Sequence, residues 1–160
     1  NGSVIPLFKK QIRNKEPITI THPGMPRFFM TIKDAVGVIL KIAAETNGRE
    51  IYILKMRALK IMDLAEAIAL RLTNKKPNIK IIGMRPGEKL YEMLLTEEEA
   101  KRAEDKGNIM VLRQQLLTPH YVSKILRPKK TIRPEEYDSR KATFLSKQEI
   151  INLLVSEKII

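Results

Sequence analysis

The sequence predicts a mixed α/β protein. Stretches in which apolar residues recur at helical spacing alternate along the chain with short, nearly continuous apolar runs typical of strands. The chain has 160 residues, 43% of them hydrophobic, which suffices for one domain with a core of its own. The expected order of elements is α-β-α-β-α-β-α-β-α.

The N-terminal part of the chain predicts a helix followed by a strand. Ser3 can cap a helix that runs to about Arg13, with Pro6 inside its first turn, where proline is tolerated. Residues 17–21 are expected to form a short strand, and residues 22–26 a turn.

The next two elements are a helix over residues 32–43 and a strand over residues 50–54. Thr31 with Asp34 makes a weak capping box, and a Gly at residue 48 helps to end the helix. The strand is almost continuously apolar. This pattern predicts a strand that is buried on both faces between parallel neighbours, as part of a larger sheet.

The remaining elements are signalled by periodicity and caps. A helix is expected over residues 61–72, and strands are expected over 79–82 and 109–112. Thr96 opens a short helix between those two strands.

The chain is expected to end in a helix. Ser146 and Glu149 form a capping box, and Leu145 can contact Ile150 as a hydrophobic staple. A polar stretch over 128–146 precedes this helix.

Charge and composition limit the function classes. The net charge of +12 attracts polyanions or anionic metabolites. A basic cluster consists of Lys124, Arg127, Lys129, Lys130 and Arg133. Without interleaved aromatic residues this cluster looks like a loop, so nucleic acid is an unlikely partner.

No Cys is present, which excludes thiolate metal sites, and the two His make no ligand pattern, so no metal is expected. No apolar run approaches about 20 residues, and the start does not resemble a signal peptide, so a cytoplasmic location without a membrane span is expected.

The segment with the most chemical content is the turn around Arg85, Gly87 and Glu88. A planar guanidinium can bind a phosphate through two parallel hydrogen bonds, and a carboxylate can accept hydrogen bonds from a sugar diol. The turn would therefore suit a phosphorylated, hydroxylated ligand such as a nucleotide. The alternative, favoured by the residue types alone, is an exposed turn whose ion pair contributes little.

Four stretches together resemble a known family. Residues 2–8, 18–23, 25–31 and 85–92 occur in the order and spacing found in the C-terminal, substrate-binding half of extended short-chain dehydrogenase/reductases that act on nucleotide sugars. The group most similar is that of the UDP-N-acetylglucosamine 4,6-dehydratases and related epimerases of polysaccharide biosynthesis. The resemblance covers roughly residues 2 to 112.

The resemblance implies a Rossmann-like fold of which this chain holds the C-terminal part. Residues 1–127 would be a small mixed nucleotide-sugar-binding subdomain with one strand-helix unit of the larger sheet. Residues 128–160 would be a polar connection and a C-terminal helix. Most of the cofactor-binding half would be missing.

The family uses NAD(P), which it binds with a Gly-rich loop after the first strand. The nearest glycines here, Gly83 and Gly87, do not make such a loop. The family's catalytic Tyr and Lys would lie upstream, and the same spacing at Tyr137 and Lys141 is interpreted as coincidence. We therefore expect no catalytic residue, no bound cofactor and no activity in this chain alone.

The resemblance assigns roles to individual residues. The substrate-binding set is Ser3, Val4, Ile18, Thr19, Ile20, Arg27, Arg85 and Glu88. Arg27 would reach the diphosphate, Arg85 a phosphate or the ribose, and Glu88 the ribose hydroxyls. Ser3 and Val4 would lie at the start of the helix below the sugar, and the alternative is a plain helix start without a ligand contact. Ile18, Thr19 and Ile20 would form the strand that flanks the nucleobase, and the alternative is an edge strand with a structural role only. Residues 28–30 are expected in the core.

The function expected from this resemblance is the substrate-binding portion of a UDP-N-acetylhexosamine-type 4,6-dehydratase or epimerase. Its partners would be a UDP-sugar, the cofactor-binding half of the enzyme and, as a further candidate, a second copy of the chain. Two other hypotheses stay open. One is a basic nucleic-acid-binding module, and the other is a partner-binding fragment without a ligand site.

Overall fold

The computed structural model describes residues 4–46, 48–113 and 135–160 in two compact units. The first unit comprises Asn1–Phe29, Arg57–Glu92 and Thr143–Ile160, and the second comprises Met30–Met56 and Met93–Ala142. The expected division at residue 127 and the basic cluster around it lie outside the described residues. That division therefore stays a prediction.

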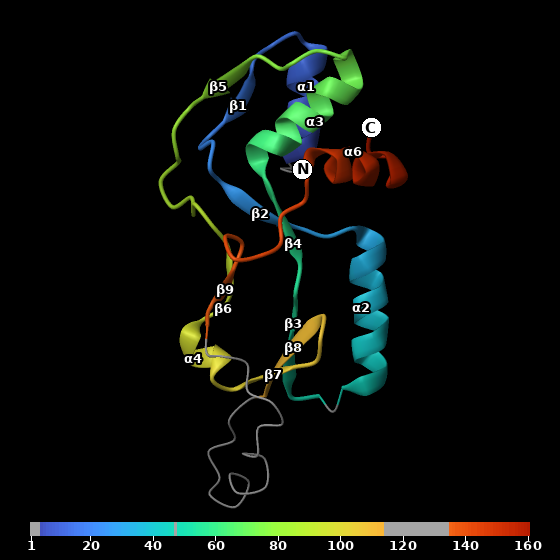
Figure 1. The fold of residues 1–160 in the computed structure, drawn as a ribbon, viewed down its shortest axis with the longest axis vertical. Coiled ribbons are helices and arrows are strands. Elements are labelled where there is room, and N and C mark those ends of the chain that lie inside the picture. The colour runs from blue at the N-terminus through green and yellow to red at the C-terminus, as the bar shows by residue number, and fades with distance from the viewer. Residues whose placement is uncertain (1–3, 47, 114–134) are drawn as a thin grey trace, which may run out of the picture. The chain divides into compact units, whose positions relative to one another are not determined.

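The first unit contains three helices and four strands among its described residues (Figure 1). They are α1 (Val4–Arg13), β1 (Ile18–Ile20), β2 (Pro26–Phe29), β4 (Arg57–Lys60), α3 (Ile61–Thr73), β5 (Ile79–Ile81) and α6 (Lys147–Ser156). β1 pairs in parallel with β5, and β2 pairs antiparallel with β4. The expected helices α1, α3 and α6 and the expected strands β1 and β5 are confirmed. The proposed Ser3 cap lies outside the described residues.

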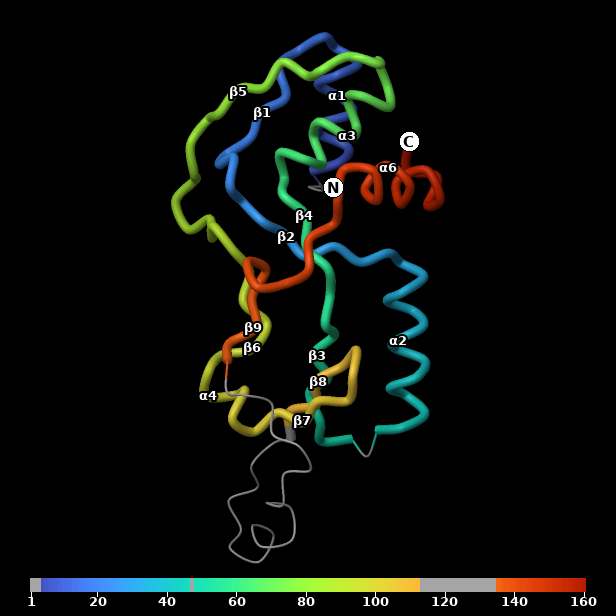
Figure 2. The backbone as a smooth tube through the Cα atoms, in the orientation of Figure 1, coloured from blue at the N-terminus to red at the C-terminus, as the bar shows by residue number. Residues whose placement is uncertain are grey.

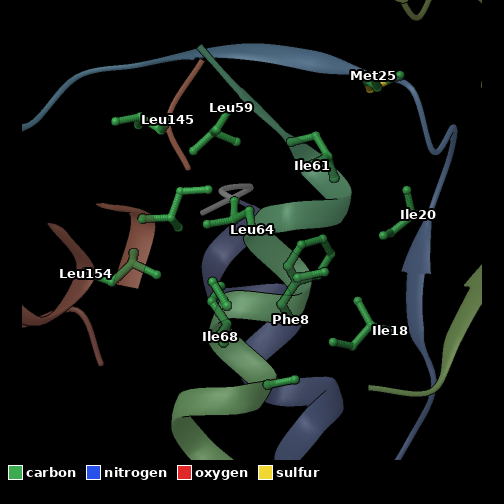
Figure 3. Packing of buried hydrophobic residues seen from close by; sticks show 14 residues of the cluster. Phe8, Ile18, Ile20, Met25, Leu59, Ile61, Leu64, Ile68, Leu145 and Leu154 are labelled. Atoms are coloured by element: carbon green, nitrogen blue, oxygen red, sulfur yellow. The ribbon is translucent and has the colours of Figure 1, made fainter. Parts of the chain in front are cut away.

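α3 is the centre of the first unit's core. Its apolar residues Ile61, Leu64 and Ile68 recur at helical spacing and are buried, so one face of the helix is committed to packing. α1 and α6 both lie against α3. Figure 3 shows side chains from α1, β1, β4 and α6 converging on this face, with Phe8 next to α3. The unit is thus held together by contacts between segments that are far apart in sequence.

The capping box of α6 forms as expected. The Ser146 hydroxyl accepts a hydrogen bond from the Glu149 N–H at 3.3 Å, and Glu149 Oε2 accepts one from the Ser146 N–H at 2.9 Å. Leu145 and Ile150, the expected staple, are both buried in the same core cluster. Glu149 also binds Arg57 of β4, with 2.6 Å between Nη1 and Oε1. The cap therefore ties the last helix to a strand of the same unit.

The second unit contains two helices and five short strands among its described residues. They are α2 (Ile32–Glu45), β3 (Glu50–Leu54), β6 (Met93–Leu95), α4 (Glu97–Ala100), β7 (Ala103–Asp105), β8 (Ile109–Arg113) and β9 (Tyr137–Asp138). β3, β8 and β7 form an antiparallel sheet in that order, and β6 pairs antiparallel with β9. The expected caps are present, because Thr31 accepts from the Asp34 N–H and Thr96 forms a full capping box.

The parallel neighbours expected for the strand at residues 50–54 are not found among the described residues, and its place in a larger sheet stays a prediction. β3 pairs antiparallel with β8, with Ile51 opposite Leu112, and it has no parallel neighbour among the described strands. Ile53 is buried, but Ile51 is 50% exposed. Antiparallel sheets can face solvent on one side, so an apolar strand did not require burial on both faces.

Strands β2, β4, β6, β7 and β9 are absent from the sequence-based prediction. Each has only two to four residues, which is too short for a period-two pattern to stand out. Most of their partners are distant, as Arg27 of β2 opposite Leu59 of β4 illustrates, whereas β7 pairs with β8, which follows it directly. Phe28 and Phe29 are both half-buried, and the core expectation is confirmed for Phe29, which packs against the core. It is wrong for Met30, which is exposed.

None of the helices in the described ranges has the length and hydropathy that crossing a bilayer requires.

The role of α3 predicts a difference between two leucines on the same helix. Leu64 is 2% exposed and Leu70 is 48% exposed. Leu64→Ala should reduce the free energy of unfolding by about 2–5 kcal/mol, because it leaves a cavity among well-packed neighbours. The matched control Leu70→Ala should change it by no more than about 0.5 kcal/mol. Chemical denaturation of both variants measures this, and equal losses would contradict the assigned core.

The Glu149 contacts predict a specific pH dependence. The Arg57 guanidinium, followed by the backbone N–H and hydroxyl of Ser146, lowers the pKa of Glu149 from 4.5 to about 2. Since the folded pKa lies below the ordinary value, the stabilisation is complete above about pH 4.5 and is lost as the pH falls towards 2. The melting temperatures of the natural protein and Glu149→Gln should differ at pH 6 and converge near pH 2. If the difference in melting temperature between the two proteins stayed the same from pH 6 to pH 2, the role given to Glu149 would be wrong.

Candidate functional site

The candidate site lies in the first unit, at the carboxyl ends of the parallel strands β1 and β5. Residues 21–25 follow β1, and residues 82–92 follow β5 (Figure 2). The Ile82 N–H donates to the Ile20 carbonyl at 2.9 Å, which continues the strand pairing into the second segment. Because the two strands are parallel, the segments that leave them start from the same edge. We call residues 82–92 the site loop.

The site loop contains a tight turn at Arg85–Glu88. The Glu88 N–H donates to the Arg85 carbonyl at 3.0 Å, with Pro86 and Gly87 in the two central positions. Gly87 has a φ of 79°, as the second central residue of a type II turn requires. A Cβ built on Gly87 would meet no atom within 4 Å, so glycine is favoured here for its conformation alone.

The Glu88 carboxylate closes this turn. Its Oε2 accepts from the Arg85 N–H at 3.0 Å, and its Oε1 accepts from the Thr21 hydroxyl at 3.0 Å. The Arg85 N–H lowers the pKa of Glu88 most, and the Thr21 hydroxyl and the charges of Arg27 and Arg85 add to this effect. An ionised carboxylate thus joins the site loop to the end of β1.

The Arg27 guanidinium holds the second half of the site loop. Nη2 donates to the Lys89 carbonyl at 2.7 Å, and Nη1 donates to the Leu90 carbonyl at 3.0 Å and to the Pro26 carbonyl at 2.9 Å. Nε lies 3.6 Å from Glu92 Oε1. Arg27 projects from β2, so its planar group connects this strand to the loop that follows β5.

The Arg85 side chain has a different setting. The residue is exposed, and its guanidinium donates no hydrogen bond to any of the described residues. Its charge nevertheless acts on Glu88. The structure therefore brings Arg27, from a distant part of the sequence, to the loop that holds Arg85 and Glu88. Their roles toward a phosphate or a ribose stay predictions.

The other predicted site residues are committed mainly to the core. The side chains of Ile18 and Ile20 are buried in it, so we expect any ligand contact at these two positions to involve the backbone. Thr19 is held by Gln11, whose amide donates to the Thr19 hydroxyl at 2.9 Å and accepts from its N–H at 3.2 Å. Val4 packs partly against the core, and Ser3 lies outside the described residues.

Two residues of this arrangement were not singled out in the sequence. Thr21 supports Glu88, and Glu92 pairs with Arg27. Thr21 is a polar residue directly after a strand, which is the one signal that could have identified it. Glu92 lies in the site loop and pairs with a residue of β2, and no local pattern indicates that contact.

The spacing of Tyr137 and Lys141 does not create a base. The Tyr137 hydroxyl donates to the Met56 carbonyl at 2.8 Å, and burial raises the pKa of this phenol. A catalytic tyrosine base requires the opposite shift. Lys141 pairs with Glu136 at 3.4 Å. These contacts support the interpretation of the spacing as coincidence.

The glycines of the site loop do not fit a dinucleotide cradle. Such a cradle leads from a strand into a helix whose N-terminus faces the pyrophosphate. The loop with Gly83 and Gly87 leads from β5 into β6 instead. The site loop is therefore not a dinucleotide cradle, and we derive no chemical step through NAD(P).

Comparison with known proteins places the chain in a family. The family model described as polysaccharide biosynthesis protein matches residues 1–114. An uncharacterized membrane protein of Methanocaldococcus jannaschii is 41% identical over 159 residues, covering 96% of this chain and 45% of the relative. A UDP-glucose 4-epimerase of Rickettsia bellii is 36% identical over 156 residues, covering 97% of this chain and 46% of the relative.

A capsular polysaccharide biosynthesis protein, CapD, of Staphylococcus aureus is 49% identical over 102 residues, covering 61% of this chain and 17% of the relative. The X-ray structure of Pen from Bacillus thuringiensis matches with a TM-score of 0.82 and 30% identity, over 100% of this chain and 47% of that one.

Two of these relatives match nearly the whole chain, so the similarity continues beyond residue 112, where the sequence analysis ended it. The chain spans less than half the length of the relatives it matches. The fold, the family model and the relatives agree with the resemblance seen in the sequence. The chain belongs to the polysaccharide biosynthesis protein family and corresponds to the C-terminal part of its extended short-chain dehydrogenase/reductases.

Proposed function

We propose that this chain is the nucleotide-sugar-binding portion of a 4,6-dehydratase or epimerase that makes a sugar precursor for polysaccharide biosynthesis. Family membership supports the sugar-biosynthetic role, and the name of the Rickettsia relative, UDP-glucose 4-epimerase, supports a UDP-sugar as the ligand. A UDP-N-acetylhexosamine is the ligand class that we favour. In the complete enzyme NAD(P) would supply the hydride chemistry.

The observation that carries the proposal is the exposed guanidinium of Arg85 beside an ionised Glu88 on an anchored loop. A diphosphate offers the oxygens that a guanidinium binds through two parallel hydrogen bonds. A ribose offers hydroxyl donors, and a carboxylate oxygen with two lone pairs can accept a further hydrogen bond while it keeps Thr21 and Arg85. One nucleotide diphosphate would satisfy both groups.

Arg27 contributes to this site by holding the loop. With its Nη atoms bound to the Lys89 and Leu90 carbonyls, it fixes the backbone that follows Glu88. A loop already ordered in the free protein loses less conformational entropy when a ligand binds. Any additional contact of Arg27 with the diphosphate would use the N–H of Nη2 that is not directed at Lys89.

Arg27→Lys tests the anchoring of the site loop. Lysine keeps the charge but cannot reproduce two donors fixed in one plane. Loss of even one hydrogen bond from a charged donor, worth about 1.5 kcal/mol, should speed exchange of the Glu88 amide roughly tenfold. Hydrogen exchange read by NMR measures this rate. Arg71→Ala, which removes an exposed arginine of α3, is the control and should leave the rate unchanged. An unchanged exchange rate in Arg27→Lys would show that Arg27 does not order the site loop.

Arg85→Ala tests the ligand assignment. Loss of a hydrogen bond to a charged group costs about 1.5–3 kcal/mol, so UDP should bind roughly ten- to a hundredfold more weakly. Arg85→Lys should recover only part of this loss, because it lacks the bidentate geometry. Calorimetric titration of the natural chain, both variants and the Arg71→Ala control measures these affinities. Uridine, which lacks phosphate, should bind all four proteins alike.

Three results would favour other functions. Equal UDP affinity of the natural chain and Arg85→Ala would remove Arg85 from the site. No UDP binding by the natural chain would favour a partner-binding fragment without a ligand site. Binding of RNA or DNA with a steep salt dependence would favour the basic nucleic-acid-binding module.

A further inference from the structure

The first unit contains a hollow on the outer face of α1, away from the candidate site. Its volume is about 690 Å³, which is within the usual range for small-molecule sites. The site loop, whose residues are all described, contributes nothing to its lining. We call it the α1 hollow. Its wall from α1 consists of Ile5, Pro6, Lys9, Lys10 and Arg13, and its wall from the segment after α6 is Ile159.

The Ile159 wall is fixed to the rest of the unit. The Ile159 N–H donates to the Leu154 carbonyl at 2.8 Å, which turns the chain back onto the end of α6. The Lys9 ammonium donates to the Ile159 carbonyl and so connects this wall to α1. Ile5 and Ile159 both pack partly against the core of the unit. The α1 hollow is therefore shaped by core packing on both sides.

The α1 hollow gathers positive charge that the described residues do not neutralise. Lys9, Lys10 and Arg13 lie three or four residues apart, so their side chains share one face of α1. None of the three forms an ion pair with a described carboxylate. The other lining residues are uncharged. Three cations beside apolar side chains favour an anionic ligand that also has an apolar part.

These cations are not required to complete the end of α1. Basic side chains in a last helical turn can hydrogen-bond the final carbonyls. Here the backbone does so, because the Asn14 N–H donates to the Lys10 carbonyl at 3.0 Å and the Glu16 N–H donates to the Gln11 carbonyl at 2.9 Å. Lys10 and Arg13 are exposed, and their side chains donate no hydrogen bond to a described residue. Both groups are therefore available to a ligand.

We propose that the α1 hollow binds an organic phosphate that carries an apolar group. The Arg13 guanidinium can bind two phosphate oxygens in parallel, and the Lys10 ammonium adds a second positive charge. Lys9 keeps two further N–H donors beside the one that binds the Ile159 carbonyl. The apolar group would lie against Ile5 and Ile159. Soluble phosphate esters and phospholipid headgroups share this chemistry.

This binding is separate from the proposed nucleotide-sugar function, because the site loop does not line the hollow. Arg85→Ala should therefore leave binding at the α1 hollow unchanged. A change at Arg13 should equally leave the affinity for UDP unchanged. Loss of one activity without the other distinguishes the failure of this proposal from the failure of the proposed function.

Calorimetric titration with hexyl phosphate and inorganic phosphate provides the first test. Hexyl phosphate should bind the natural chain at least tenfold more tightly, because inorganic phosphate cannot contact the apolar wall. Arg13→Gln should weaken binding of hexyl phosphate about tenfold. Arg71→Gln is the matched control, since Arg71 is an exposed arginine in the last turn of another helix of the same unit and should have no effect.

Three results of these titrations would overturn the proposal. The first is equal affinity for hexyl phosphate and inorganic phosphate, which indicates non-specific attraction to a basic surface. The second is equal affinity of the natural chain and Arg13→Gln for hexyl phosphate. The third is a loss in Arg71→Gln as large as that in Arg13→Gln. All variants are compared at one salt concentration, because binding of an anion to exposed cations is screened by salt.

Ile159→Ser tests the apolar wall. It should weaken binding of hexyl phosphate severalfold and leave binding of inorganic phosphate unchanged, because only the alkyl contact is removed. Equal effects on the two probes would contradict the role of the wall. Melting temperatures verify that the variant is folded, and if it is not, the comparison of the two probes in Arg13→Gln decides.

Co-sedimentation with vesicles distinguishes the two sources of the ligand. Phosphatidylcholine vesicles with and without phosphatidic acid are mixed with the natural chain and Arg13→Gln. Binding that requires both phosphatidic acid and Arg13 assigns the hollow to a lipid headgroup. Binding of hexyl phosphate without such sedimentation assigns it to a soluble phosphate ester. If neither probe binds in an Arg13-dependent way, the proposal is wrong.

Discussion

The Arg27 guanidinium is the contact on which the candidate site depends. It joins the backbone of the site loop to β2 by donating to the Lys89 and Leu90 carbonyls. Without it, the loop would be joined to the rest of the unit at its β5 end, through Glu88 and by the partial packing of Leu90 against the core. Arginine suits this position because its donors are rigid, planar and permanently charged, so they satisfy adjacent carbonyls at little entropic cost.

The anchoring also separates the roles of the two arginines. Arg27 is bound to the protein's own backbone. Arg85 is exposed next to Glu88, whose carboxylate accepts hydrogen bonds from Thr21 and from the Arg85 N–H but from no guanidinium of the described residues. A loop held by Arg27 can present Arg85 and Glu88 in a fixed relation. The Arg85 N–H, the Thr21 hydroxyl and the charges of Arg27 and Arg85 lower the pKa of Glu88 and keep it ionised, which preserves it as an acceptor. The arrangement thus provides one anion-binding group and one hydroxyl-binding group side by side.

The two units differ in how completely they bury their apolar residues. The first has a continuous core around α3, to which α1, β1 and α6 all contribute. The second has a small cluster of buried residues and an exposed helix face. Two of the relatives are about twice as long as this chain, so they contain polypeptide that this chain does not match.

The sequence by itself determined the long elements, the helix caps and the family. Helical periodicity over ten or more residues and the reciprocal bonds of Ser146 with Glu149 are local, so no tertiary information was needed to predict them. The type II turn with Pro86 and Gly87 is local in the same way. Only the tertiary structure decided that β3 pairs antiparallel, that Arg27 binds the site loop and that Thr21 supports Glu88. These contacts join residues that are tens of positions apart, and they follow from which strands pair and in which register. Pairing depends on the packing of the whole unit, and short strands carry too little periodicity to reveal it.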